Sequence, residues 1–363
     1  MPKVLLPSSD YPPARGGVAR YIQAILQTYP EQVTLLPLKR LKLDNLVLTL
    51  LFKAKDYEAI WTHHVLPVGT AVWILNKLTG KPYVIFLHGL DFDLARRNPW
   101  KQALTRRVLV SASRVVTNSQ ALATEVRDFV ELKREPLVIY PTLEDKFIAA
   151  SKHKATTGKV NLQKLGELAL GVARASTPMF VSDPSKSQTT LRLLTVGRLV
   201  ERKGHLKVLR ALAAFPAATY QIVGDGPMRE QIEAEIETLN LQDRVVLNTN
   251  VTDDELPDIY RAADIFVMPT SKTETDREGF GIVYLEAQLF GLPVIATKQP
   301  GVDEAVKDGE GGLLIGDTPA ELETAIRRLL DAAVRSKFKH RARVWAEREF
   351  SRDQQMYKLR ELL

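Results

Sequence analysis

The chain has 363 residues, of which 45% are hydrophobic and 26% charged, and its formal net charge is +7. This length suffices for two domains of ordinary size, and the composition is that of a globular protein. No apolar run approaches the roughly 18 residues of a membrane-spanning helix. The absence of cysteine excludes a disulfide framework and thiolate chemistry. The N-terminal stretch lacks the apolar region of a secretory signal, so we expect a cytoplasmic protein.

Positive charge is concentrated in the first part of the chain. Residues 1–150 hold 20 basic and 13 acidic residues, a net charge of +7, whereas residues 151–190 carry +4 and residues 191–363 carry −4. A basic first half suits nucleic acid, an anionic membrane surface or an acidic acceptor. The sequence contains no zinc-finger spacing and no basic–aromatic motif of the kind that reads nucleic acid, so a nucleic-acid partner is not expected.

Apolar strand-like runs alternate with helical patterns in both halves, which predicts a parallel α/β architecture. A glycine-opened helix is expected at 16–29. In the first half we expect strands at 3–8, 32–38, 59–64, 83–89, 114–119 and 137–141. In the second half we expect strands at 191–199, 219–227, 244–251, 264–271, 292–297 and 311–316.

Residues 142–190 are polar and lack a clear period, apart from a helical pattern at 161–175. So long an unpatterned stretch is improbable inside one domain, and we interpret it as the interdomain connection. We therefore expect an N-terminal domain over 1–180, whose end includes this linker. A C-terminal domain follows over 191–345, and the chain ends in a helix at 346–363.

The stretch ARRNPWKQALTRRVLV (95–110) predicts a basic amphipathic helix. Trp100, Leu104 and Val108 recur at every fourth position, and five cations surround them. A helix of this kind suits an anionic lipid surface. A helix packed on the core with a solvated basic face is the alternative.

The stretch GRLVERKG (197–204) follows a strand and precedes a helix, so Arg198 and Lys203 lie beyond the carboxyl end of that strand. Ligands of open α/β sheets bind at this edge. Arginine can bond two oxygens in a fork while lysine supplies a compact charge, which together suit a diphosphate. An ordinary solvated turn is the competing interpretation.

VGDGPMREQI (223–232) offers Gly-x-Gly after a strand, but Arg229 stands where a dinucleotide fingerprint needs a small residue. We therefore expect this turn to shape a crevice wall rather than to bind a dinucleotide.

REGFGIVYLEA (277–287) holds Glu278 and Glu286 on either side of a glycine-flanked helix start. Exposed amides at a helix N-terminus favour an anion. Carboxylates beside a bound diphosphate are tolerated where they accept hydrogen bonds from hydroxyls, which points to a sugar at Glu278 and a ribose at Glu286. Each glutamate taken alone also fits a solvated helix residue or a charge near the helix start.

GRLVERKG, GDGP, EGFGIVYLEA and the following PVIAT together resemble the nucleotide-sugar-binding domain of the family 4 retaining glycosyltransferases (glycosyl transferases group 1). In the first half, DYPPARGGVARYI (10–22), FLHGLD (86–91) and VVTNSQ (115–120) resemble the same family, and the first of these is similar to its lipid mannosyltransferase members. The resemblance implies the GT-B fold, in which two Rossmann-like domains face each other. It also implies that the C-terminal helix crosses back to the N-terminal domain.

The resemblance also implies roles for individual residues. Arg198 and Lys203 would hold the donor diphosphate, Glu278 would contact the transferred sugar, Glu286 the ribose, and His88 would sit beside the reacting sugar. The catalytic set is then Glu278, Arg198, Lys203 and His88. The donor pocket would add the backbone at Gly16, Gly17, Gly279, Phe280, Gly281 and Ile282.

We expect neither a metal nor another cofactor. DFD (91–93) has the Asp-x-Asp pattern of a metal site, but two carboxylates bind a divalent cation only with substrate phosphates nearby. Asp91 is expected instead as a contact on the acceptor side. His63 and His64 are expected to be polar groups with satisfied hydrogen bonds rather than catalytic residues.

The expected function is transfer of a hexose from GDP-mannose or a UDP-sugar, with retention, to a glycolipid, a lipid-linked glycan or another cell-surface glycan such as lipopolysaccharide. Peripheral contact with anionic membrane on the cytoplasmic face is part of this expectation. The alternatives are a soluble transferase acting on a sugar or sugar phosphate, as sucrose and trehalose synthases do, a nucleotide-sugar epimerase, and a catalytically silent binding protein.

Overall fold

The computed structural model describes residues 3–11, 16–38, 43–152, 191–273 and 277–363. They form two compact units, and each is described here by itself. The first comprises residues 1–144, 279–282 and 349–363, and the second residues 145–278 and 283–348. The helix predicted at 161–175 lies outside the described residues.

The first unit contains, within its described residues, a parallel six-stranded sheet in the order β2-β1-β3-β4-β5-β6. The six predicted strands of the first half are confirmed, each within a few residues of its expected bounds. They are β1 (Val4–Ser8), β2 (Val33–Pro37), β3 (Ala59–Thr62), β4 (Tyr83–Leu87), β5 (Arg114–Thr117) and β6 (Leu137–Val138).

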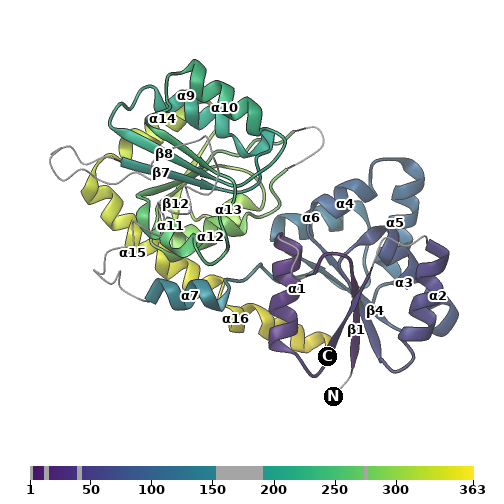
Figure 1. Ribbon diagram of the computed structural model, residues 1–363. Helices are drawn as coiled ribbons and strands as arrows, with labels where there is room; N and C mark the ends of the chain where they lie inside the picture. Colours follow the sequence, from purple (N-terminus) through teal and green to yellow (C-terminus); the bar gives the residue numbers. More distant parts are fainter. Residues whose placement is uncertain (1–2, 12–15, 39–42, 153–190, 274–276) are drawn as a thin grey trace. The chain divides into compact units, whose positions relative to one another are not determined.

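Helices cover both faces of this sheet (Figure 1). Successive residues of a strand face opposite sides, so Val4 and Leu6 join one core cluster while Leu5 joins the other. The helices are α1 (Gly17–Thr28), α2 (Leu43–Lys53), α3 (Thr70–Thr79), α4 (Leu90–Ala95), α5 (Pro99–Ser111), α6 (Gln120–Phe129) and α16 (Arg352–Tyr357). A π-helical turn (Val65–Gly69) precedes α3, and a 3₁₀ turn (Lys358–Leu362) follows α16.

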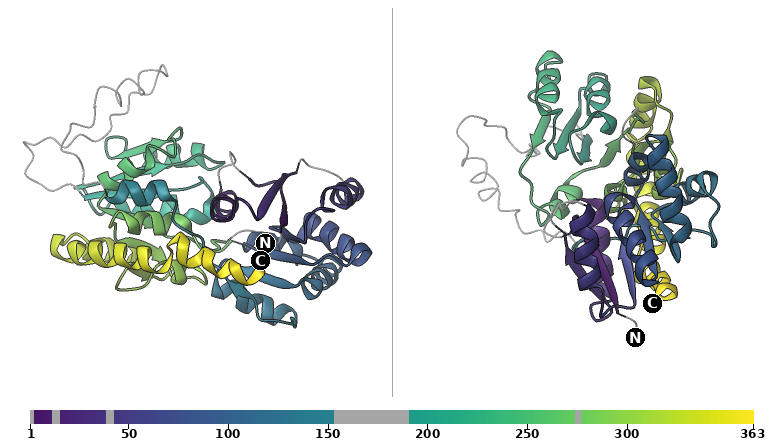
Figure 2. Two further views of the ribbon diagram at one scale, coloured as in Figure 1. Left: turned by 90° about the horizontal axis from the view of Figure 1, so that it is seen from below. Right: turned by 90° about the vertical axis from the view of Figure 1, so that its right-hand side faces the viewer.

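The C-terminal segment packs on the first unit. Met356 and Leu359 are fully buried in the cluster that contains α1, and the Tyr29 hydroxyl donates to the Met356 carbonyl at 2.8 Å. The two chain ends lie close to each other in all views of Figures 1 and 2. The helix expected over the last residues is broken at Ser351, whose extended backbone begins α16. The segment therefore returns to the first unit, as the GT-B arrangement implies.

The second unit also contains, in its described part, a parallel six-stranded sheet, in the order β12-β11-β10-β7-β8-β9. Its predicted strands are confirmed as well. They are β7 (Leu191–Val196), β8 (Ala218–Val223), β9 (Val245–Asn248), β10 (Ile265–Met268), β11 (Val294–Thr297) and β12 (Gly312–Ile315). In both sheets the strands are nearly continuous apolar runs, as expected for sheets that are buried on both faces.

The helices of the second unit are mostly connections between its successive strands (Figure 1). They are α7 (Asp145–Lys152), α9 (His205–Leu212), α10 (Arg229–Thr238), α11 (Leu256–Ala262), α12 (Ile282–Leu289), α13 (Val302–Ala305), α14 (Pro319–Arg328) and α15 (Ala332–Glu349), with a 3₁₀ turn at Glu201–Lys203. Across the described ranges of both units, no helix is long and apolar enough to cross a membrane.

Helix α7 lies at the start of the stretch interpreted as the interdomain connection, where no helix was predicted before residue 161. Its Phe147 is fully buried, with its ring edge-on to Tyr260 and Phe290 at centroid distances of 6.2 and 6.3 Å. The aromatic contact anchors the chain to the second unit directly after residue 144, where the first unit ends.

We therefore expect Phe147→Ala to lower the free energy of unfolding of the second unit by about 3–5 kcal/mol, because the substitution leaves a cavity in a packed aromatic cluster. Urea unfolding followed by tryptophan fluorescence and circular dichroism would measure the change. Phe52→Ala is the matched control, since Phe52 is 69% exposed. Equal unfolding midpoints for the two variants would contradict this anchoring role.

Candidate active site

The loop between β7 and α9 brings the cationic residues to the carboxyl edge of the second sheet. Gly204 has φ 73°, and a side chain there would collide with the carbonyl oxygen of Pro269, so only glycine fits this turn. On the other side, the Leu199 amide donates to the Asp225 carbonyl at 3.0 Å. The GDGP turn thus supports the β7–α9 loop, as expected for a crevice wall.

Strand order explains why this edge gathers polar residues. β7 pairs with β8 on one side and β10 on the other, so the loops after β7 and β10 leave the sheet in opposite directions. Such a topological switch point opens a crevice at the carboxyl ends of the strands. Lys203 follows β7 and Glu278 follows β10.

Glu278 and Lys203 form a buried ion pair at this switch point. The Lys203 ammonium donates to Glu278 Oε2 at 2.6 Å, and the Arg202 guanidinium donates to the same oxygen. Lys203 and Glu278 are only 6% and 8% exposed. The cluster thus combines two cations with one carboxylate.

The pKa of Glu278 reflects two opposing effects. Burial raises the pKa of this carboxyl, but the charges of Lys203 and Arg202 and their hydrogen bonds outweigh burial, so the pKa lies below its ordinary value. Glu278 is therefore ionised at neutral pH and accepts hydrogen bonds.

Arg198 is exposed on the same loop, whereas Lys203 is buried. The sequence analysis paired Arg198 with Lys203 and did not single out Arg202. The 3₁₀ turn at Glu201–Lys203 directs both Arg202 and Lys203 toward Glu278. Arg202 is visible in the sequence as a cation next to Lys203. Only the geometry of the 3₁₀ turn shows that its side chain points toward Glu278.

Glu286 lies in α12, which begins at Ile282, directly after Gly281, as predicted. It is 1% exposed, and the Tyr260 hydroxyl from α11 donates to its Oε2 at 2.8 Å. A solvated Glu286 is therefore excluded. Tyr260 is a partner that the sequence analysis did not identify.

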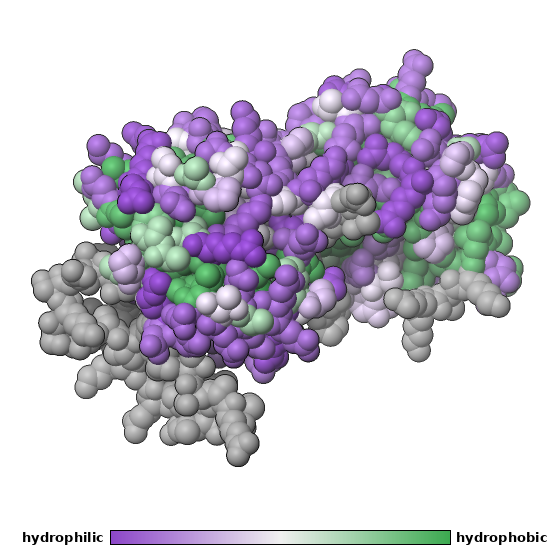
Figure 3. Space-filling model, turned by 90° about the horizontal axis from the view of Figure 1, so that it is seen from above, coloured by the Kyte–Doolittle hydropathy of each residue, from purple (hydrophilic) through white to green (hydrophobic). Residues whose placement is uncertain are grey.

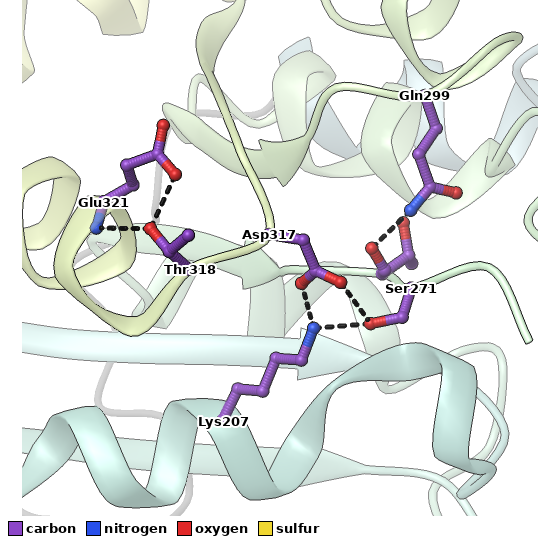
Figure 4. Close-up of polar contacts among 7 residues, drawn as sticks. Lys207, Ser271, Gln299, Asp317, Thr318 and Glu321 are labelled. Carbon is purple, nitrogen blue, oxygen red and sulfur yellow. Dashed lines mark hydrogen bonds and ion pairs between the residues drawn. The ribbon is translucent and has the colours of Figure 1, made fainter.

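A second polar cluster ties together the loops at this edge (Figure 4). Lys207 of α9 bonds both Ser271, which follows β10, and Asp317, which follows β12. Ser271 Oγ also donates to Asp317 at 3.1 Å. Beside it, Thr318 caps α14 by accepting from the Glu321 amide at 3.3 Å. One lysine of the helix that follows β7 thus joins the segments that follow β10 and β12.

In the first unit, His88 follows β4 and is half-buried. Its Nε2 lies 2.9 Å from Nδ1 of His63, which follows β3. Its main-chain amide donates to Asp91 Oδ1 at 2.9 Å. Burial, followed by the charge of His64, lowers the pKa of His88 to about 3. His88 is therefore a neutral imidazole at physiological pH.

Asp91 and Asp93 lie in the short helix α4, and their carboxylates interact with different partners. Burial raises the pKa of Asp91 to about 7, although backbone hydrogen bonds from His88 and its neighbours oppose this rise. Asp93 instead pairs with Arg96 at 2.6 Å. In the part of the chain that the structure describes, no group of three or more His, Asp or Glu side chains is arranged so that it could hold a metal ion.

The glycine residues expected at the donor pocket occupy two segments. Gly16 and Gly17 are exposed at the start of α1, and no described atom lies within 4 Å of where a side chain would begin. Gly279, Phe280 and Gly281 belong to the first unit, where the buried Phe280 ring stacks on Tyr140 at 5.6 Å. A side chain at Gly279 would come within 2.9 Å of the His88 carbonyl oxygen.

Each unit is thus a Rossmann-like parallel sheet with polar residues at its carboxyl edge, which defines a two-domain α/β protein of the GT-B type. The profile of the group 1 glycosyl transferases matches residues 181–345, and that of glycosyltransferase family 4 matches residues 4–143. Between them these profiles account for most of the chain, which belongs to the family 4, group 1 glycosyltransferases.

Two curated relatives share part of the sequence. A GDP-mannose-dependent alpha-(1-6)-phosphatidylinositol monomannoside mannosyltransferase from Mycolicibacterium smegmatis is 37% identical over 38% of this chain and 38% of its own length. A D-inositol 3-phosphate glycosyltransferase from Acidothermus cellulolyticus is 36% identical over 40% of this chain and 34% of its own. The matched region thus spans little more than a third of each relative.

Solved structures share the fold over the whole chain. The crystal structure of Anabaena HepE in complex with UDP-glucose superimposes with a TM-score of 0.78 at 22% identity, covering all of both chains. Such agreement at this identity establishes a common architecture.

The charge balance at Glu278 predicts a pH dependence of stability. Because the folded-state pKa of Glu278 is lowered, the ion pair contributes fully above about pH 4.5, the ordinary value for the carboxyl. The contribution is lost as the pH falls through the lower folded-state pKa. Glu278→Gln leaves Lys203 and Arg202 without their counter-charge, so it should be less stable than the wild type at pH 7, and the gap should narrow toward pH 3.

Urea unfolding at pH 7, 5, 4 and 3 would measure this convergence. Glu233→Gln is the matched control, because Glu233 forms an exposed pair with Arg229, and exposed pairs contribute little. A constant difference between wild type and Glu278→Gln across the series would refute the assignment of the ion pair.

Proposed function

We propose that this protein transfers a hexose from a nucleoside-diphosphate sugar, GDP-mannose or a UDP-sugar, to a glycolipid or lipid-linked glycan, with retention at the anomeric carbon. The observation that carries the proposal is the buried set of Lys203, Arg202 and Glu278 at the switch point. The set is net positive, lies where Rossmann-like sheets receive nucleotides, and combines cations for a diphosphate with a carboxylate for sugar hydroxyls.

The chemistry follows from these charges. The bond between the anomeric carbon and the diphosphate oxygen breaks, and its electron pair goes to the diphosphate. Lys203, Arg202 and the exposed Arg198 stabilise the negative charge that develops there. The acceptor hydroxyl bonds the oxocarbenium-like carbon on the same face, and its proton goes to a diphosphate oxygen. Glu278 accepts hydrogen bonds from hydroxyls of the sugar, and Glu286, with Tyr260, from the ribose.

Lys203→Ala and Arg198→Ala should each reduce transfer by about 30- to 1,000-fold, equivalent to about 2–4 kcal/mol of transition-state stabilisation. Release of GDP or UDP from the matching nucleotide sugar would measure the rate. Arg210→Ala is the matched control, because Arg210 is an exposed residue of α9 that pairs with Glu235. Near-normal turnover by both folded variants would overturn the proposed role of this cationic loop.

The lipid acceptor is supported by the surface of the first unit. Eight of the eleven exposed large apolar side chains among the described residues lie on four consecutive helices of this unit, and Figure 3 shows hydrophobic side chains at the end where α2 and α3 lie. The eight side chains are Leu43, Leu48, Phe52, Leu78, Leu90, Leu94, Trp100 and Val110. Large exposed apolar groups of this kind mark interaction sites.

Basic residues on the same helices favour an anionic bilayer as the partner. An open groove between α3 and α5 is lined by Trp73, Lys77, Arg106, Arg107, Val110 and Ser111. Basic residues next to inserted apolar groups favour anionic lipid. The apolar face predicted along α5 is only partly exposed, because Val108 is buried and Leu104 packs against the core. The proposed membrane contact therefore involves α2 and α3 as well as Trp100.

Replacing Phe52 and Leu78, which are 69% and 64% exposed, with glutamate should abolish co-sedimentation with vesicles rich in phosphatidylglycerol, because two charges then face the acyl chains. The control pair is Leu330→Glu and Val344→Glu, exposed positions in the second unit, which should still sediment. Binding that is equal for neutral and anionic vesicles would contradict the membrane proposal.

A soluble acceptor such as a sugar phosphate is the second candidate, favoured by the similarity to a D-inositol 3-phosphate glycosyltransferase. Offering glycolipid in vesicles and inositol phosphate in parallel distinguishes the two. Interconversion of the donor sugar without any acceptor would instead identify an epimerase.

A further inference from the structure

Two imidazoles in the first unit, one buried and one half-buried, form a direct hydrogen bond. His63, at the end of β3, is fully buried, and its Nδ1 lies 2.9 Å from Nε2 of His88, at the end of β4. The two rings are nearly parallel, at 12°. The Phe86 ring also stacks on the His63 ring, at a centroid distance of 4.6 Å. The His63 ring is therefore fixed by packing, and its hydrogen bond determines what His88 can offer.

Each ring carries a single proton at neutral pH. Burial lowers the pKa of His63 well below its ordinary value, and His88 and His64 lower it further. Burial likewise lowers the pKa of His88 to about 3. The shared hydrogen bond then has two possible directions: either His63 Nδ1–H donates to His88 Nε2, or His88 Nε2–H donates to His63 Nδ1.

The second nitrogen of His63 decides between these directions. His63 Nε2 is buried and has no hydrogen-bond partner among the described residues. If His88 donated, the only proton of His63 would sit on Nε2 as an orphaned N–H, which folded proteins avoid more strictly than an unused acceptor. If His63 donates, Nε2 carries only a lone pair.

We propose that His63 is a positioning residue that donates its Nδ1–H to His88 Nε2 and so holds His88 in the tautomer protonated on Nδ1. His88 then presents an N–H donor at its free edge and has no basic nitrogen to offer there. Its Nδ1 makes no hydrogen bond to any described side chain or backbone group, which leaves this donor available to a ligand.

This inference rests on the proposed function for its consequence. Beside a bound nucleotide sugar, a neutral N–H donor bonds a hydroxyl oxygen of the hexose and cannot remove a proton from the acceptor. His63, which never touches the sugar, would thus contribute to selection of the donor sugar. The nucleoside diphosphate alone has no hexose hydroxyl, so its affinity should not depend on the tautomer of His88.

Two substitutions at one position test the idea. In His63→Asn the side-chain amide nitrogen occupies nearly the place of Nδ1 and can still donate, whereas His63→Leu fills a similar volume without a donor. In ¹⁵N-histidine spectra, with His88→Gln used to assign the signal, wild type and His63→Asn should show His88 protonated on Nδ1 alone. His63→Leu should show protonation at Nε2 as well.

Binding supplies a readout that a merely structural role would not alter. His63→Leu should bind the nucleotide sugar about 3- to 10-fold more weakly, the effect of one hydrogen bond, while its affinity for the nucleoside diphosphate stays unchanged. His63→Asn should restore sugar binding. Equal weakening for both ligands would show a general distortion and overturn the inference.

The spectra separate this inference from the proposed function. Protonation of His88 on Nε2 in the wild type would overturn the inference whatever the enzyme transfers. Protonation on Nδ1 in a protein that binds and transfers no nucleotide sugar would uphold the hydrogen bond and overturn the proposed function instead.

Discussion

A carboxylate buried between two cations organises the second unit. Removing Lys203, Arg202 and Glu278 from water is unfavourable, and an apolar set of similar volume is often as stable as a buried ion pair. Stability alone therefore gives little reason to keep Lys203 and Glu278 at 6% and 8% exposure. Under the proposed function, the arrangement serves as a preorganised anion site in which Glu278 orients the cations.

The two units reach similar polar edges through different strand orders. In the first sheet the order reverses between β1 and β3, and in the second between β7 and β10. In both, the residues with distinctive chemistry follow the strands at or next to the reversal: His63 and His88 after β3 and β4, and Lys203 and Glu278 after β7 and β10. Parallel strands all end at one edge, so residues distant in sequence become neighbours there.

Most of the sheet architecture could be predicted from the sequence, because strands buried on both faces are apolar runs bounded by glycine, proline and polar residues. Side-chain pairing could not. Tyr260 and Glu286 lie 26 residues apart on different helices, and no period links them. Arg202 and Lys203 are consecutive cations whose direction depends on one 3₁₀ turn. Helix α7 was hidden in a polar stretch, because only Phe147 marks its buried side.

The lysine that joins Ser271 and Asp317 has a consequence for protein engineering. Because Lys207 of α9 bonds the segments that follow β10 and β12, a change in the length of the loop after β7, β10 or β12 displaces an anchor of the other two. Chimeras that exchange a single loop with a homologue would disturb the rest of this edge. Transplanting the three loops as a set, together with the lysine, would preserve their mutual register.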